Sequence, residues 1–204
     1  HNLPVPEGVV VESNADLKRA LADMEKQFGR DIVLKPIAAG SALGVHILKR
    51  VRNAEPIVLQ ELTNGPLLIE PFISGREITA SVLEKSGKPV ALPIIEIKTE
   101  DEEWYDFKNR YTPGKSEHVV PAALDENIAE QIKEIALKAH QGLGLRDLSR
   151  SDFILASTGD VFLLETNTLP GFTKTSLYPD SARSYGISFV DLVSHLIEAA
   201  LARR

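Results

Sequence analysis

Apolar residues recur along this chain with two different periods, and the changes of period predict the order of its elements. In the first third, short apolar runs of the kind found in strands surround one stretch whose apolar residues recur every three or four positions. That stretch predicts a helix that begins at Ser13 and ends before Gly29. The apolar runs predict strands at 9–12, 31–36, 44–48 and 66–73.

Further along, the pattern predicts two pairs of antiparallel strands, each followed later by a helix. Segments 76–84 and 88–99 flank a Lys-Ser-Gly turn, and segment 150–167 holds two apolar runs joined by a tight turn. Helical periodicity begins after Asp125 and again after Ser188.

Two stretches follow neither period, and we expect both to be irregular. Residues 100–118 are polar and aromatic, and residues 168–186 contain two prolines and two glycines. Long loops inside compact domains are often functional. The order of strands, helices and hairpins indicates an α+β fold with two lobes that meet near residues 70–77.

Composition excludes some classes of function. The 204 residues carry a formal net charge of −6 and no cysteine, so disulfides and thiolate metal sites are excluded. The acidic balance argues against nonspecific binding to nucleic acid or to an anionic membrane. No apolar run approaches the roughly 20 residues that cross a bilayer. We therefore expect a cytoplasmic protein with no nucleic-acid or membrane partner.

The hairpin at 150–167 carries charges at its open end, where the two strands are joined to the rest of the chain. With the turn at 157–160, a loop of two or four residues fixes which side chains face each other across the pair. The predicted pairs, all with side chains on one face, are Ala156–Val161, Ile154–Leu163, Asp152–Glu165 and Arg150–Asn167.

An opposed pair of carboxylates needs compensation. Facing side chains lie about 4.5–5.5 Å apart at Cβ, and two negative charges there repel by roughly 1 kcal/mol in water and by more inside a protein. Asp152 and Glu165 could share a proton, Arg150 could neutralise one of them, or a divalent cation could lie between them with Asn167 as a third oxygen ligand. An all-oxygen set suits Mg²⁺ or Mn²⁺ rather than zinc.

We favour the metal because Arg150 and Asn167 extend the same polar face. The ordinary alternative is that the strand ends splay apart and both carboxylates are solvated. A metal held by carboxylates usually serves a phosphate, and KPIAAGSALGV (35–45) is a candidate phosphate loop. Its backbone N–H groups could bind phosphate oxygens, with Lys35 supplying charge. By itself this segment is more typical of a tight turn between two strands, with Lys35 extending from an edge.

Taken together, five segments in this order strongly resemble the ATP-grasp ligases and, within them, the D-alanine–D-alanine ligase family. The resemblance covers almost the whole chain and implies an ATP-grasp fold of two α+β lobes with ATP held between them. The central lobe would span 1–74 and the C-terminal lobe 75–204, without the N-terminal substrate domain of the family. The segments are KPIAAGSALGV, LLIEPFISGREIT, WYDFKNRYTPG, RSDFIL and LLETNTLPGFTKTSL.

The resemblance assigns one set of residues to ATP and its metals. Lys35 would bind phosphate, Gly40 and Ser41 would begin a flap over the γ-phosphate, Glu70 would bind the adenine amino group and Glu77 the ribose hydroxyls. The ATP-binding residues implied in this way are Lys35, Gly40, Ser41, Glu70, Phe72, Ile73, Glu77 and Arg110. The implied ligands of two Mg²⁺ or Mn²⁺ ions are Asp152, Glu165, which would bridge both ions, and Asn167.

A second set would act on the amino acids. Arg150 and the N–H of Gly171 would face the oxyanion of the tetrahedral intermediate, and Tyr111 would face the serine of the flap. Ser176 and Leu177 would hold the carboxylate of the second amino acid. A tyrosine at 111 points to an amine as the second substrate. The catalytic residues implied are Arg150, Gly171, Ser41 and Tyr111.

The implied function is the ATP-dependent ligation of two D-alanines through an acyl phosphate, for peptidoglycan synthesis, with a homodimer in the full-length protein. One alternative is another ATP-grasp carboxylate–amine or depsipeptide ligase. The other is an ATP-binding module with impaired catalysis, because Ala42 and Arg110 stand where the family usually has serine and lysine. We expect weak turnover from this chain alone, since the N-terminal domain contacts the first D-alanine.

Overall fold

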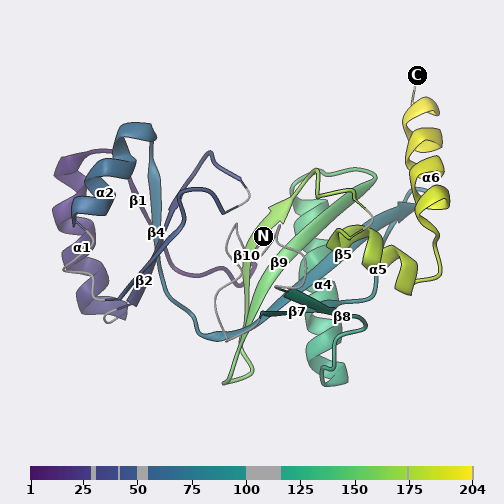
Figure 1. Cartoon of the computed structure of the whole chain (residues 1–204), viewed down its shortest axis with the longest axis horizontal. Coiled ribbons are helices and arrows are strands. Elements are labelled where there is room, and N and C mark those ends of the chain that lie inside the picture. The colour runs from purple at the N-terminus through teal and green to yellow at the C-terminus, as the bar shows by residue number, and fades with distance from the viewer. Residues whose placement is uncertain (29–30, 41, 50–54, 100–115, 174, 204) are drawn as a thin grey trace. The chain divides into compact units, whose positions relative to one another are not determined.

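A computed structural model describes residues 1–28, 31–40, 42–49, 55–99, 116–173 and 175–203 (Figure 1). These residues form two compact units. The N-terminal unit comprises Pro6–Ile73, and the C-terminal unit comprises His1–Val5 with the described residues from Ser74 onwards. The α+β class predicted from the sequence is confirmed.

The N-terminal unit is a four-stranded antiparallel sheet with helices on one face. Its core consists of apolar residues that alternate along the strands and recur along the helices, such as Ile32, Leu34 and Leu17. In sheet order the strands are β1 (Val9–Val11), β4 (Leu67–Pro71), β2 (Asp31–Pro36) and β3 (His46–Lys49), and the helices are α1 (Asn14–Phe28), α2 (Glu55–Glu61) and the 3₁₀ turn η2 (Leu62–Asn64).

The C-terminal unit is built on a six-stranded antiparallel sheet with helices on both faces (Figure 1). Five of the strands follow the order β10-β9-β5-β7-β8. The sixth, β6, lies outside this order and pairs with β5. None of the helices in the described parts is long and apolar enough to cross a membrane. The elements are β5 (Gly75–Lys85), β6 (Lys88–Ala91), β7 (Ile95–Thr99), β8 (Ser116–Val119), α4 (Glu126–Gly142), β9 (Leu148–Ala156), β10 (Val161–Asn167), α5 (Leu177–Ser184) and α6 (Phe189–Leu201).

Alternation along β5 separates the two faces of this sheet. Ile78, Ala80 and Val82 pack with α4, whereas Leu83 packs with α5 and α6 on the opposite face. Polar residues on the second face, beyond the part that α5 and α6 cover, are therefore available for chemistry.

Several elements differ from the sequence-based prediction. Helix α2 was not predicted, and β8 overlaps the end of the segment expected to be a loop. The strand expected at 88–99 is broken around Pro93 into β6 and β7. Pro93 lacks the N–H that a continuous ladder needs. Helix α5 lies in a segment that was expected to be irregular, because its sequence follows neither period. Pro179 falls in the first turn, where backbone N–H groups have no partner within the helix.

The β9–β10 turn corrects the predicted register near its tip. Gly159, at φ +90°, donates its N–H to Ala156 O, and Ala156 N donates to Asp160 O. This is a three-residue loop with a left-handed residue at its last position, not a loop of two or four residues. Val161 therefore pairs with Leu155, instead of with Ala156.

A β-bulge further along β10 returns the register to the predicted one. Leu163 pairs with Phe153 instead of Ile154, and the register then shifts between Leu163 and Glu165. Beyond the bulge Glu165 pairs with Asp152, and Asn167 with Arg150 in the same register, as predicted. The register set by the three-residue loop places Leu163 in the core opposite Phe153, so Leu163 does not share a face with Asp152. The bulge then allows Glu165, two residues further on, to face the site.

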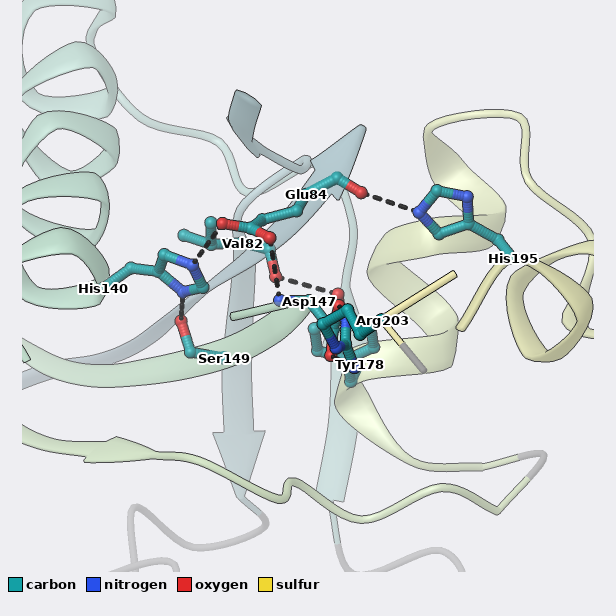
Figure 2. A network of polar contacts seen from close by, with 8 residues as sticks. All are labelled: Val82, Glu84, His140, Asp147, Ser149, Tyr178, His195 and Arg203. Atoms are coloured by element: carbon teal, nitrogen blue, oxygen red, sulfur yellow. Dashed lines mark hydrogen bonds and ion pairs between the residues drawn. The ribbon is translucent and has the colours of Figure 1, made fainter. Parts of the chain in front are cut away.

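A polar network joins α4 to β5 and β9 in the C-terminal unit (Figure 2). His140 is 1% exposed, with Nδ1 2.8 Å from Ser149 Oγ and Nε2 3.7 Å from Glu84 Oε1. The second distance is too long for a hydrogen bond. Burial therefore outweighs the nearby carboxylate and lowers the pKa of His140.

This burial predicts a pH-dependent loss of stability. A folded-state pKa below the unfolded value of about 6.5 means that the unfolded chain binds more protons between the two values. Stability should fall as the pH drops below about 6.5, by at most about 1.4 kcal/mol per pH unit from this group. Urea unfolding at pH 7.5 and 5.5 should show a smaller fall in H140N, where an amide replaces the ring beside Ser149. Equal falls in both proteins would contradict the prediction.

Candidate functional site

The carboxylate of Asp152 is the centre of a polar cluster on the sheet of the C-terminal unit. Thr79 Oγ1 donates a 2.8 Å hydrogen bond to Oδ1. Arg150 donates from Nε to Oδ1 at 2.8 Å and from Nη2 to Oδ2 at 2.7 Å. Asn167 Nδ2 lies 3.1 Å from Asp152 Oδ2 and 3.1 Å from Glu165 Oε1. Three neighbouring strands thus bring five polar side chains together.

Local structure explains this convergence. Arg150 and Asp152 lie two residues apart on β9, so both side chains project from the same face. The bulge on β10 places Glu165 and Asn167 opposite them. On the other side of β9, Thr79 of β5 pairs with Asp152. The predicted site residues Arg150, Asp152, Glu165 and Asn167 are therefore brought together.

The structure also shows how the two carboxylates are accommodated. Arg150 forms a bidentate ion pair with Asp152, whose side chain is 15% exposed, and the Asn167 amide bridges Asp152 to Glu165. Of the three options considered for this pair, neutralisation of one carboxylate by Arg150 matches this geometry, although the metal was favoured. The strand ends do not splay apart, because β9 and β10 stay paired as far as Arg150 and Asn167. Asp152 is largely buried, whereas Glu165 is exposed.

The donor set fits a magnesium-type cation. Within the described ranges, no group of three or more His, Cys, Asp or Glu side chains could hold a metal, so a site here needs the amide as well. Oxygens of Asp152 and Glu165 already converge on the Asn167 amide. Half a turn of that amide about its last torsion would present its oxygen instead of its nitrogen. Two carboxylates and an amide oxygen are ligands that Mg²⁺ and Mn²⁺ accept.

The predicted substrate segment lies at the beginning of α5. Ser176 precedes the helix, and its Oγ accepts a 3.0 Å hydrogen bond from Thr173 N. A Cβ on Gly171 would come 3.1 Å from Ser176 Oγ, so these two predicted residues lie close together. Leu177 is 6% exposed, so its side chain belongs to the core and only its backbone could serve a ligand.

Helix α5 is tied to the sheet by Tyr178. Its hydroxyl donates a 2.8 Å hydrogen bond to Val82 O, and its ring is fully buried. Burial raises the pKa of Tyr178, so the phenol stays neutral. This contact fixes the start of α5, and therefore Ser176, relative to β5.

Glu77, the predicted ribose ligand, follows Arg76 on β5, and Arg76 is held in place by Glu96. Arg76 donates two 2.8 Å hydrogen bonds to Glu96, and these bonds lower the pKa of the Glu96 carboxyl. Glu77 pairs with Ile97 and Ile154 in the ladders and shares a face with Thr79. The ribose role of Glu77 stays a prediction.

In the N-terminal unit, two predicted ATP residues contact each other. Lys35 Nζ lies 2.6 Å from Glu70 Oε2, with side chains 22% and 9% exposed. Strands β2 and β4 are adjacent in the sheet, which brings together residues 35 positions apart. Lys35 was assigned to phosphate and Glu70 to adenine, but the ion pair between them was not predicted. Phe72, whose backbone was assigned to the adenine edge with that of Ile73, donates its N–H to Asp31 O.

The predicted phosphate loop is only partly described. Leu43 N donates to Gly40 O, and Ala42 lies in the left-handed region at φ +59°. A Cβ on Gly40 would meet nothing within 4 Å. Ser41, Arg110 and Tyr111 lie outside the described residues, so their roles stay predictions.

This chain is similar to known sequences over almost its whole length. The family described as "D-ala D-ala ligase C-terminus" matches residues 1–198. The D-alanine–D-alanine ligase of Desulforudis audaxviator is 40% identical, over 98% of this chain and 65% of its own length. That of Pelotomaculum thermopropionicum is 38% identical, over 98% and 64%. The chain thus spans just under two thirds of these relatives.

Solved structures agree on the fold. The D-alanine–D-alanine ligase from Bacillus anthracis, complexed with ATP, is 26% identical with a TM-score of 0.79, covering 98% of this chain and 61% of that one. The D-alanyl-alanine synthetase A from Vibrio cholerae has a TM-score of 0.86 at 22% identity, with the same coverage, and supports the fold alone.

Proposed function

This chain belongs to the D-alanine–D-alanine ligase family, as its C-terminal part, and on that premise we propose that it serves the ATP-dependent joining of two D-alanines for peptidoglycan synthesis. It has the ATP-grasp fold of that family. The observation that carries the proposal is the convergence of Asp152, Glu165 and Asn167 beside Arg150 on one face of the sheet.

The proposed reaction has two steps. A carboxylate oxygen of the first D-alanine attacks the γ-phosphorus of ATP, so that an O–P bond forms and ADP leaves. The amine of the second D-alanine then attacks the acyl carbon, loses a proton, and expels phosphate. Positioning and electrostatics supply most of the catalysis of phosphoryl transfer.

Each residue in this proposal has a physical task. The Lys35 ammonium balances phosphate charge, and an ammonium has three donors, so it can keep Glu70 while it binds a phosphate oxygen. Arg150 and the Gly171 N–H would stabilise the oxyanion of the second step. Ser176, fixed at the start of α5, would hold the carboxylate of the second amino acid.

Asp152, Glu165 and Asn167 would hold the divalent cations, Mg²⁺ or Mn²⁺, which when bound neutralise charge on the transferred phosphoryl group. We infer two ions, with Glu165 shared between them. A cytoplasmic location and a homodimer are proposed from the family resemblance alone.

Turnover measurements test the proposal. Phosphate release from ATP and Mg²⁺ should rise with D-alanine, yield D-alanyl-D-alanine, and not respond to D-lactate or L-alanine. We expect low turnover by this chain, because it spans only part of its relatives. Calorimetry should nevertheless detect Mg·ADP binding. Release that depends on D-lactate would favour a depsipeptide ligase instead.

A second candidate is an ATP-binding module with impaired catalysis. Ala42, where the family usually has serine, supports it, because one hydroxyl contact to the γ-phosphate would be missing. This candidate predicts Mg·ATP binding by calorimetry with no ADP formed in the presence of any amino acid. ADP formation that depends on D-alanine would exclude it.

A further inference from the structure

Thr79 is a buried hydroxyl beside the proposed cation site. It is 1% exposed and pairs with Asp152 across β5 and β9. Its Oγ1 lies 2.8 Å from Asp152 Oδ1 and 3.2 Å from the carbonyl oxygen of Ser151. A hydroxyl has one proton to donate, and the shorter contact is the one to the carboxylate, where a charged acceptor makes the stronger bond.

The two oxygens of Asp152 are held differently. Oδ1 accepts from Thr79 and from Arg150 Nε, both buried groups of the sheet. Oδ2 accepts from Arg150 Nη2 and from the amide of Asn167. A carboxylate oxygen has about two lone-pair positions, so two donors saturate Oδ1. On Oδ2, one of the two donors is an amide that can turn away.

We propose that Thr79 is a positioning residue: its hydroxyl holds Oδ1 of Asp152, so that only Oδ2 of this carboxylate is available to a divalent cation. The inference rests on the proposed function, because it takes Asp152 as a cation ligand. The terminal torsion of aspartate is broad and has no strong rotamer preference. Hydrogen bonds, not the torsion itself, therefore set the plane of the carboxylate.

Without the Thr79 hydroxyl, the orientation of the Asp152 carboxylate should be less restricted. Arg150 would still reach both oxygens, but Oδ1 would lose one of its two donors, and the carboxylate could turn toward two-oxygen coordination. Groups that orient metal ligands typically contribute 10–100-fold in metal affinity. A purely structural Thr79, which only links the strands through the Ser151 carbonyl, would affect folding and leave cation affinity unchanged.

The test compares T79V, which keeps the branched shape, with T79S, which keeps the hydroxyl. Mn²⁺ binding in the presence of ADP is measured by calorimetry and by electron paramagnetic resonance of free Mn²⁺. We expect T79V to bind Mn²⁺ about 10–100-fold more weakly and T79S to stay within about threefold of the unsubstituted chain. T158V removes another threonine hydroxyl, exposed at the β9–β10 turn, and should have no effect.

The possible outcomes distinguish the role of Thr79 from the proposed function on which it rests. Unchanged Mn²⁺ affinity in T79V, with a lower thermal midpoint, would overturn the role of Thr79 and leave the proposed function intact. Weakening in T79S equal to that in T79V would overturn it as well. Failure of the unsubstituted chain to bind Mn·ADP would overturn the proposed function and this inference together. If T79V did not fold, T79A would be measured in the same way.

Discussion

The E165Q variant is expected to lose divalent-cation binding almost completely while becoming no less stable without metal. A group that only orients a metal ligand contributes about 10–100-fold in affinity, so removing a charged ligand should cost about 100-fold or more. Without metal, the same substitution should not lower the stability of the fold. Asp152 and Glu165 are paired like charges, which destabilise a sheet when they lie directly opposite each other. An amide at 165 removes that repulsion.

Calorimetric titration of Mn²⁺ into the chain with ADP measures the first effect, and urea unfolding in EDTA measures the second. E198Q makes the same chemical change at an exposed position of α6 in the same unit and should leave both unchanged. Cation affinity in E165Q close to that of the unsubstituted chain would contradict the assignment of Glu165. A large loss of stability in EDTA would instead show that the carboxylate supports the fold.

How well the sequence predicts a contact in this site depends on how far apart in the sequence the two residues lie. Alternation along a strand is local, so the pattern alone could place Arg150 and Asp152 on one face. The pairing of Asp152 with Glu165 matches the prediction because the three-residue loop and the β-bulge shift the register in opposite directions. Loop length and bulges are also local, but several turns suit the sequence Ser-Thr-Gly-Asp. The register near the tip was wrong because Gly159 takes the left-handed position of a three-residue loop.

Contacts between strands that are distant in the sequence could not be predicted. Thr79 carries no signal of its own, because its partner is 73 residues away and becomes visible only once β5 lies beside β9. Lys35 and Glu70 were each identified as site residues through the family resemblance. Their ion pair depends on β4 lying between β1 and β2, an order that no local pattern specifies.

The K35M variant is expected to destabilise the N-terminal unit by about 3 kcal/mol. Removing one partner of a buried ion pair leaves an uncompensated charge, at a cost of about 3–5 kcal/mol. The Glu70 side chain is 9% exposed and cannot reach water easily, whereas Lys35 is 22% exposed. E70Q should therefore cost less than K35M, because the ammonium can extend toward solvent. Urea unfolding of the two variants measures both costs.

The double variant K35M/E70Q separates folding from ligand binding. Without the carboxylate no buried charge remains, so the double variant should recover most of the stability that K35M loses, with a coupling of about 2 kcal/mol between the two positions. Affinity for ADP and Mg²⁺ should stay as low in the double variant as in K35M, since the phosphate-binding ammonium is missing from both. If nucleotide affinity recovered together with stability, Lys35 would act through the fold alone and its assignment to phosphate would be wrong.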